Sequence, residues 1–196
     1  MTLSCSSEKA DYCLSEWKPD PEFWKKISYK KEWKKHMDEV NKLRKKITDR
    51  FPELDNSIKL GLGADTDKWL KIPPDQKGDP DFEIYWNYKI LCYIEVSGSD
   101  KVVMTSKKDI WIRPDKYRNA LRKIGKYWFW MVYRNGVYVL DLESLHPFKG
   151  NIVTEYIKTD PETGMRVPEK FVAIPSVKAL SEDQMFGWIG AQIRSS

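Results

Sequence analysis

The sequence has few of the residues that build disulfides and metal centres, and it has no long apolar run. Only three of its 196 residues are cysteine and two are histidine. Cys5, Cys13 and Cys92 form no C-x-x-C pair, so we expect a reduced, cytoplasmic chain without a zinc site. The densest apolar run, residues 127–133, is far shorter than the roughly 20 residues that span a bilayer. The opening residues show no signal-peptide pattern, and we expect neither a membrane protein nor a secreted one.

Aromatic and charged residues are abundant instead, at 13% and 32% of the chain. A length of 196 residues with 41% hydrophobic residues is enough to bury a core, which excludes a fully disordered chain. The net charge of +5 divides into +4 over 1–50, −5 over 51–100, +7 over 101–150 and −1 over 151–196. This pattern has two interpretations. It is either ordinary solvated surface, or a carboxylate site flanked by surface that binds phosphates.

The spacing of apolar residues predicts an alternation of helices and strands. A helix is expected over 22–51, where apolar residues recur every three or four positions. Alternating apolar residues predict a β-hairpin over 81–97, and Asn135-Gly136 predicts the turn of a second one. The other expected elements are strands at 57–62, 127–133, 137–142, 152–158 and 170–174 and helices at 115–125 and 181–193. This order predicts a single α/β domain with a mixed central sheet.

The register of the first hairpin follows from its apolar faces. A slip of one residue would put the apolar residues of its two arms on opposite faces of the sheet. A three-residue turn at 87–89 pairs Trp86 with Ile90 and sets Asp81 opposite Glu95. Opposed Cβ atoms lie about 5 Å apart, so these like charges must either face water or hold a cation. Two converging carboxylates suit Mg²⁺, which prefers oxygen ligands.

The segments Gly78-Asp79-Pro80-Asp81-Phe82 and Tyr93-Ile94-Glu95-Val96-Ser97 resemble the PD-(D/E)XK nuclease superfamily. This superfamily includes restriction endonucleases and archaeal Holliday-junction resolvases. The resemblance covers residues 35–145 and implies a restriction-endonuclease-like αβββαβ core. Residues 1–34 would then be an N-terminal extension with an extra helix, and 146–196 a C-terminal extension packed on the core.

The resemblance also implies the chemistry of the site. Asp81 and Glu95 match the two carboxylates that hold Mg²⁺, for which Mn²⁺ can substitute. The first helix of the family often supplies a glutamate, and Glu39 is the best-placed match. Because resolvases of this superfamily are dimers, the resemblance implies a homodimer as well.

One position departs from the family pattern. Ser97 stands where the family has a lysine that positions or activates the attacking water. A serine cannot supply a positive charge. Either the lysine has moved to a neighbouring element, with Lys101 and Lys116 as candidates, or catalysis has been lost.

The favoured function is therefore a metal-dependent endonuclease that hydrolyses DNA. Its backbone contacts are expected from two basic helices, through Lys42, Lys45, Lys46, Arg118, Arg122 and Lys123. The alternatives are an inactive nuclease-fold module for DNA binding or protein assembly, and an adaptor that uses the tryptophan-rich N-terminus. His36 and His146 are interpreted as surface residues, which disfavours a histidine-activated nucleophile.

Overall fold

A mixed five-stranded sheet forms the centre of the protein. The computed structural model describes residues 29–61, 79–145, 151–159 and 164–195. The strands lie in the order β1-β2-β3-β5-β6, and every neighbouring pair is antiparallel except β3 and β5, which are parallel. Their bounds are β1 Ile58–Leu60, β2 Phe82–Trp86, β3 Lys89–Ser99, β5 Lys126–Tyr133 and β6 Gly136–Asp141. The predicted α/β class with a mixed central sheet is confirmed.

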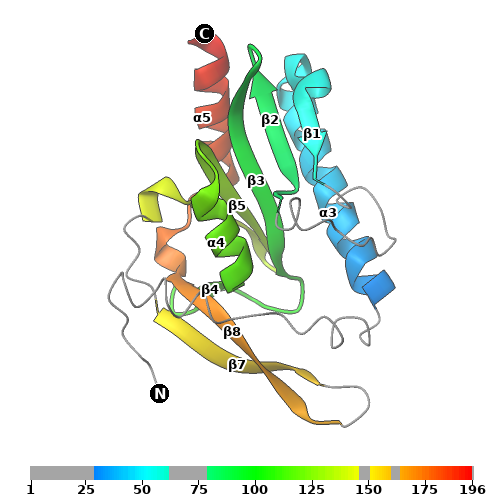
Figure 1. Ribbon diagram of the computed structural model, residues 1–196, viewed down its shortest axis with the longest axis vertical. Coiled ribbons are helices and arrows are strands. Elements are labelled where there is room, and N and C mark those ends of the chain that lie inside the picture. The colour runs from blue at the N-terminus through cyan, green and yellow to red at the C-terminus, as the bar shows by residue number, and fades with distance from the viewer. Residues whose placement is uncertain (1–28, 62–78, 146–150, 160–163, 196) are drawn as a thin grey trace.

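Helices cover both faces of this sheet (Figure 1). On one face, α3 (Tyr29–Arg50) and α5 (Glu182–Arg194) enclose a core that includes Val40, Leu43 and Ile47 of α3. These α3 residues follow the predicted spacing of three or four positions; the predicted residues 22–28 lie outside the described part of the chain. On the other face, α4 (Pro114–Arg122) packs a second core against the aromatic residues of β3 and β5.

A smaller three-stranded sheet stands beside the first, in the order β4-β8-β7. It consists of β4 Asp109–Ile112, β7 Asn151–Thr159 and β8 Arg166–Pro175, and the pair β7–β8 extends away from the helices (Figure 1). The strands predicted at 152–158 and 170–174 are present, and they pair with each other as antiparallel neighbours. The sequence interpretation missed β4, because four residues are too few to show a clear alternation. The described part of the chain also contains three short 3₁₀ helices: η1 Pro52–Ser57, η2 Glu143–Leu145 and η3 Ser176–Lys178.

The first hairpin keeps its predicted register only away from the turn. Phe82 pairs with Ile94 and Ile84 with Cys92, as expected. The predicted pairing of Trp86 with Ile90 is wrong, because Trp86 pairs with Lys89. Asn87 and Tyr88, with φ of 49° and 61°, form a two-residue turn of the kind that matches strand twist. A β-bulge takes up the extra residue of β3, so the register at the site end is unaffected.

None of the helices in the described ranges is long and apolar enough to cross a membrane.

Candidate functional site

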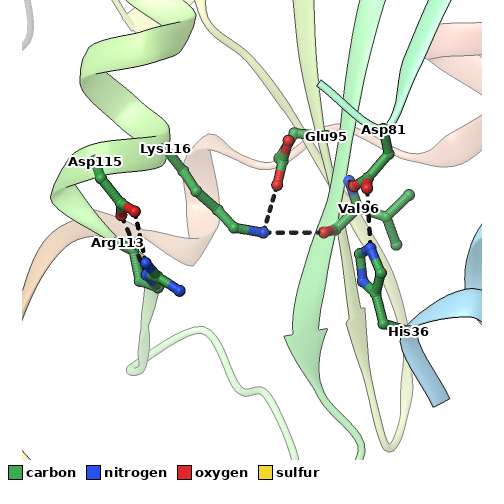
Figure 2. Close-up of polar contacts among 7 residues, drawn as sticks. All are labelled: His36, Asp81, Glu95, Val96, Arg113, Asp115 and Lys116. Carbon is green, nitrogen blue, oxygen red and sulfur yellow. Dashed lines mark hydrogen bonds and ion pairs between the residues drawn. The ribbon is translucent and has the colours of Figure 1, made fainter. Parts of the chain in front are cut away.

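Asp81 lies immediately before β2 and is held by contacts from two other elements. Extending the register of Phe82 and Ile94 by one residue sets Asp81 opposite Glu95. Its Oδ2 accepts a hydrogen bond of 2.7 Å from the backbone N–H of Val96 on β3. Its Oδ1 lies 2.9 Å from Nε2 of His36 on α3 (Figure 2). Asp81 is only 9% exposed, so these contacts fix a buried carboxylate.

Gly61 fixes the backbone at Asp81. Its N–H donates a hydrogen bond of 3.0 Å to the carbonyl of Asp81. A Cβ at position 61 would lie 2.2 Å from the carbonyl oxygen of Pro80, far inside contact distance. Only glycine therefore allows the chain after β1 to approach Pro80 and Asp81 so closely.

Glu95 meets Lys116, which reaches it from the first turn of α4 (Figure 2). The Lys116 ammonium forms an ion pair with Oε1 of Glu95 and lies 3.5 Å from the backbone oxygen of Val96. Glu95 is 6% exposed. The neighbouring Asp115 is paired with Arg113 at 2.5 Å and 3.1 Å. Strand β3 and helix α4 thus contribute an ion pair beside Asp81 in which Glu95 is buried and Lys116 half-buried.

The buried charges shift one another's pKa values. Burial raises the pKa of Glu95 to about 7, with Asp81 adding to the rise and Lys116 opposing it. Burial also acts to raise the pKa of Asp81, but His36, Lys116 and the Val96 N–H outweigh it and lower that pKa. Burial acts to lower the pKa of Lys116, yet Glu95 and Asp81 raise it overall. Two carboxylates therefore share one charged ammonium.

The site offers hard oxygen donors to a cation. The Lys116 ammonium already lies between a Glu95 oxygen and the Val96 carbonyl, and Asp81 lies immediately before the adjacent strand β2. Oxygen ligands of this kind are those that Mg²⁺ prefers. In the described ranges, no group of three or more His, Cys, Asp or Glu residues is arranged to hold a metal. An ion here would thus depend on the two carboxylates, backbone oxygen and water.

The structure distinguishes between Lys101 and Lys116, the two candidates to replace the family's lysine. Lys116 contacts Glu95. Lys101 is exposed and lies beyond the end of β3 at Ser99, where its charge helps to lower the pKa of Asp100. Ser97 is half-buried on β3, two residues after Glu95. Lys116 is the basic residue that the structure brings to the carboxylates.

The interpretation of His36 as a surface residue is wrong. Its side chain is 20% exposed and contacts Asp81. Glu39, the glutamate that the first helix was expected to supply, pairs instead with Lys42 at 2.6 Å. A signal was present in the sequence: His36, Val40, Leu43 and Ile47 are spaced by four, three and four residues. This is the spacing of the buried stripe of the helix, and its first member is the histidine.

Most of the lysines expected to contact DNA are engaged within the chain. The α3 lysines Lys42, Lys45 and Lys46 pair with Glu39, Asp49 and Glu182, each at 2.6 Å. Lys123 pairs with Asp79 at 3.0 Å. Arg122 is exposed, whereas Nε and Nη2 of Arg118 are buried without hydrogen-bond partners. These side chains form no continuous free basic surface.

The chain matches no family model, no curated protein and no solved structure with which it was compared.

Proposed function

We propose that this protein is a metal-dependent nuclease that hydrolyses phosphodiester bonds in DNA. The observation that carries the proposal is the ion pair between Lys116 of α4 and Glu95 of β3, formed beside Asp81. Two carboxylates and a lysine are the groups that the family resemblance implies. Because Ser97 stands where the family has a lysine, the sequence left open the alternative that catalysis has been lost. A lysine supplied by the following helix favours the enzyme over the inactive module.

The order of elements supports a restriction-endonuclease-like core. Helix α3 precedes three antiparallel strands, β1, β2 and β3. Helix α4 then leads to β5, which runs parallel to β3. Apart from β4, which lies between β3 and α4 and belongs to the smaller sheet, this is the αβββαβ order that the resemblance implies. The lysine-bearing helix is the first helix after the strand with the second carboxylate.

The donor set at the site fits Mg²⁺ or Mn²⁺. Asp81, Glu95 and the Val96 carbonyl would hold the ion. The Lys116 ammonium already contacts oxygens of Glu95 and Val96, and the charge of Asp81 raises the pKa of Lys116. When bound, such an ion supplies an acidified water and offsets the charge of the phosphate.

The protein's own groups have distinct roles in this proposal. His36 and the Val96 N–H keep Asp81 ionised and fix its orientation. Lys116 supplies a permanent positive charge and hydrogen-bond donors for the attacking water or a phosphate oxygen. In hydrolysis, the water loses a proton and its oxygen forms a bond to phosphorus, while the bond from phosphorus to the leaving sugar oxygen breaks and that oxygen takes up a proton.

Cleavage assays with three substitutions test this function. Supercoiled, linear, single-stranded and branched DNA are incubated with wild type, Asp81→Asn, Glu95→Gln and Lys116→Ala, with Mg²⁺ or with EDTA. We expect metal-dependent cleavage by wild type and a loss of at least 100-fold in each variant. Lys123→Ala is the matched control, because Lys123 follows α4 directly and pairs with carboxylates outside the site. DNA binding without cleavage by wild type would instead establish the inactive module.

A further inference from the structure

A nuclease needs phosphate-binding side chains that are not neutralised within the chain. Lys42, Lys45, Lys46 and Lys123 fail this requirement, because each lies within 3.0 Å of a carboxylate oxygen. The search for another basic surface leads to the carboxyl end of β3. Three segments that contact one another here carry six cations, which we call the basic end: Lys34, Lys35, Lys101, Lys107, Lys108 and Arg134. Lys35 and Lys101 interact with Asp100, so the charges left unpaired within the described part of the chain are those of the other residues.

Contacts between the three segments assemble this surface. The Lys35 ammonium of α3 pairs with Asp100, directly after β3, at 2.9 Å. The backbone N–H of Arg134, in the β5–β6 turn, donates a hydrogen bond of 3.0 Å to the carbonyl of Val102. Between β3 and the start of β4, the three cations Lys101, Lys107 and Lys108 accompany two acidic residues, Asp100 and Asp109.

The segment between β3 and β4 is braced on both sides. The side-chain amide of Asn135 donates to the carbonyl of Met104 and accepts from its N–H, both at 2.9 Å. On the other side, the Ser176 hydroxyl donates to the carbonyl of Thr105 at 2.9 Å. A loop held in this way presents its lysines with little ordering cost on binding.

The basic end is connected to the carboxylate site by two elements. On α3, Lys35 is followed by His36, which contacts Asp81. On β3, Ser99 lies four residues after Glu95, which is about 13 Å along a strand. A duplex carries one phosphate per strand for about every 3.4 Å of its axis, so about four phosphates fit this span.

We propose that the DNA backbone docks on the basic end, with Lys34, Lys107 and Arg134 contacting phosphates. These three residues are exposed and form no ion pair with the part of the chain that the structure describes. The inference rests on the proposed nuclease function and identifies the surface that presents its substrate to Asp81 and Glu95. It replaces the outer face of α3 as the expected binding surface.

Two triple variants of equal charge change test this docking surface. The first is Lys34→Ala/Lys107→Ala/Arg134→Ala, and the matched control is Lys42→Ala/Lys45→Ala/Lys46→Ala. Affinity for a DNA duplex is measured in EDTA between 50 and 200 mM salt. Each lost phosphate contact lowers the log–log salt slope by about 0.9, so we expect the first variant to lose about 2.7 and the control almost nothing. Thermal unfolding checks that both variants are folded.

Failure of this inference is distinguishable from failure of the proposed function. If both triple variants keep the wild-type affinity and salt slope while wild type cleaves DNA with Mg²⁺, the basic end is not the docking surface and the nuclease function stands. An equal loss in both variants would also overturn the inference, since it would reflect net charge alone. If wild type neither binds nor cleaves DNA, both proposals are wrong.

Discussion

Asp81, Glu95 and Lys116 bring two carboxylates and one ammonium together inside the protein, and their coupling determines how the site responds to pH. The pKa of Glu95 is raised to about 7 because burial disfavours its charged form. The folded protein therefore holds this proton more tightly than the unfolded chain does. The stability that results is complete below about pH 4.5 and is lost as pH rises through about 7.

Replacing Glu95 by Gln removes this titration. In EDTA, the free energy of unfolding of wild type should fall relative to Glu95→Gln by about 3 kcal/mol between pH 4.5 and pH 8, at about 1.4 kcal/mol per pKa unit. Urea unfolding at several pH values measures the difference. Parallel pH profiles for the two proteins would show that Glu95 does not titrate in this range.

His36 lowers the pKa of Asp81, whereas burial raises the pKa of Glu95. Burial alone would raise the pKa of Asp81, but the interaction with His36 and the contacts from Lys116 and Val96 lower it. The stability that results is present above the unfolded-chain pKa of about 3.8 and is lost as pH falls through the lower folded value. His36 is therefore a positioning residue whose loss should weaken the folded state above about pH 3.8.

We expect His36→Ala to unfold at a higher pH than wild type in an acid titration. His36→Gln, whose side-chain amide can still donate to Asp81, should shift less. Tryptophan fluorescence in EDTA reports the midpoint. Superimposable curves for wild type and His36→Ala would show that the contact with Asp81 contributes no stability.

At the scale of elements, the close approach of the chain after β1 to Pro80 positions the first carboxylate. A Cβ on residue 61 would lie 2.2 Å from a backbone oxygen, which cannot move aside as a flexible side chain can. We expect Gly61→Ala to lower the free energy of unfolding by about 1–3 kcal/mol and to reduce cleavage by displacing Asp81. Denaturant unfolding and the DNA assay measure the two effects.

Gly187→Ala is the control for this substitution. Gly187 lies on the exposed side of α5, with no atom within 4 Å of its added Cβ. Alanine has a higher helix propensity than glycine, so this variant should gain up to about 1 kcal/mol. Equal effects of the two substitutions would contradict the steric argument at Gly61.

The same scale shows where sequence patterns were reliable. The amphipathic spacing of α3 was sufficient to predict its buried face. The alternation in the first hairpin predicted the buried face with Phe82 and Ile94, but it did not show that Tyr93 and Glu95 on the opposite face are buried too. The turn was mispredicted because Asn87 and Tyr88 both adopt positive φ, which is uncommon for residues other than glycine. The sequence alone did not show that a bulge would absorb the resulting shift.

At the scale of the whole molecule, a bound metal should stabilise the folded chain, because the site exists only there. A ligand at 100 times its dissociation constant adds about 2.7 kcal/mol. We expect Mg²⁺ to raise the melting temperature of wild type and to leave Asp81→Asn/Glu95→Gln unchanged. Glu39→Gln, in which the lost carboxylate belongs to a pair with Lys42, should respond as wild type does. A shift of the same size in the double variant would place the ion elsewhere.

The effect of the charge pattern along the chain also depends on the whole molecule, because charges from different segments pair in the folded protein. The sequence shows an acidic segment between two basic ones. In the folded protein, carboxylates of the acidic segment partly neutralise the basic ones, as in the pair of Asp79 with Lys123. The phosphate-binding surface that we propose consists of cations at the carboxyl end of β3 that are not paired in this way within the described residues.

The sequence by itself determined the features that depend on local periodicity. Alternation along two strands joined by a short turn was enough to set Asp81 and Glu95 on one face of the sheet. Only the tertiary structure decided which other groups join them. His36 lies 45 residues before Asp81 and reaches it from α3, while Lys116 reaches Glu95 from α4. These two contacts depend on how the helices pack against the sheet. That packing results from many apolar contacts between residues far apart in the sequence, which no local sequence pattern predicts.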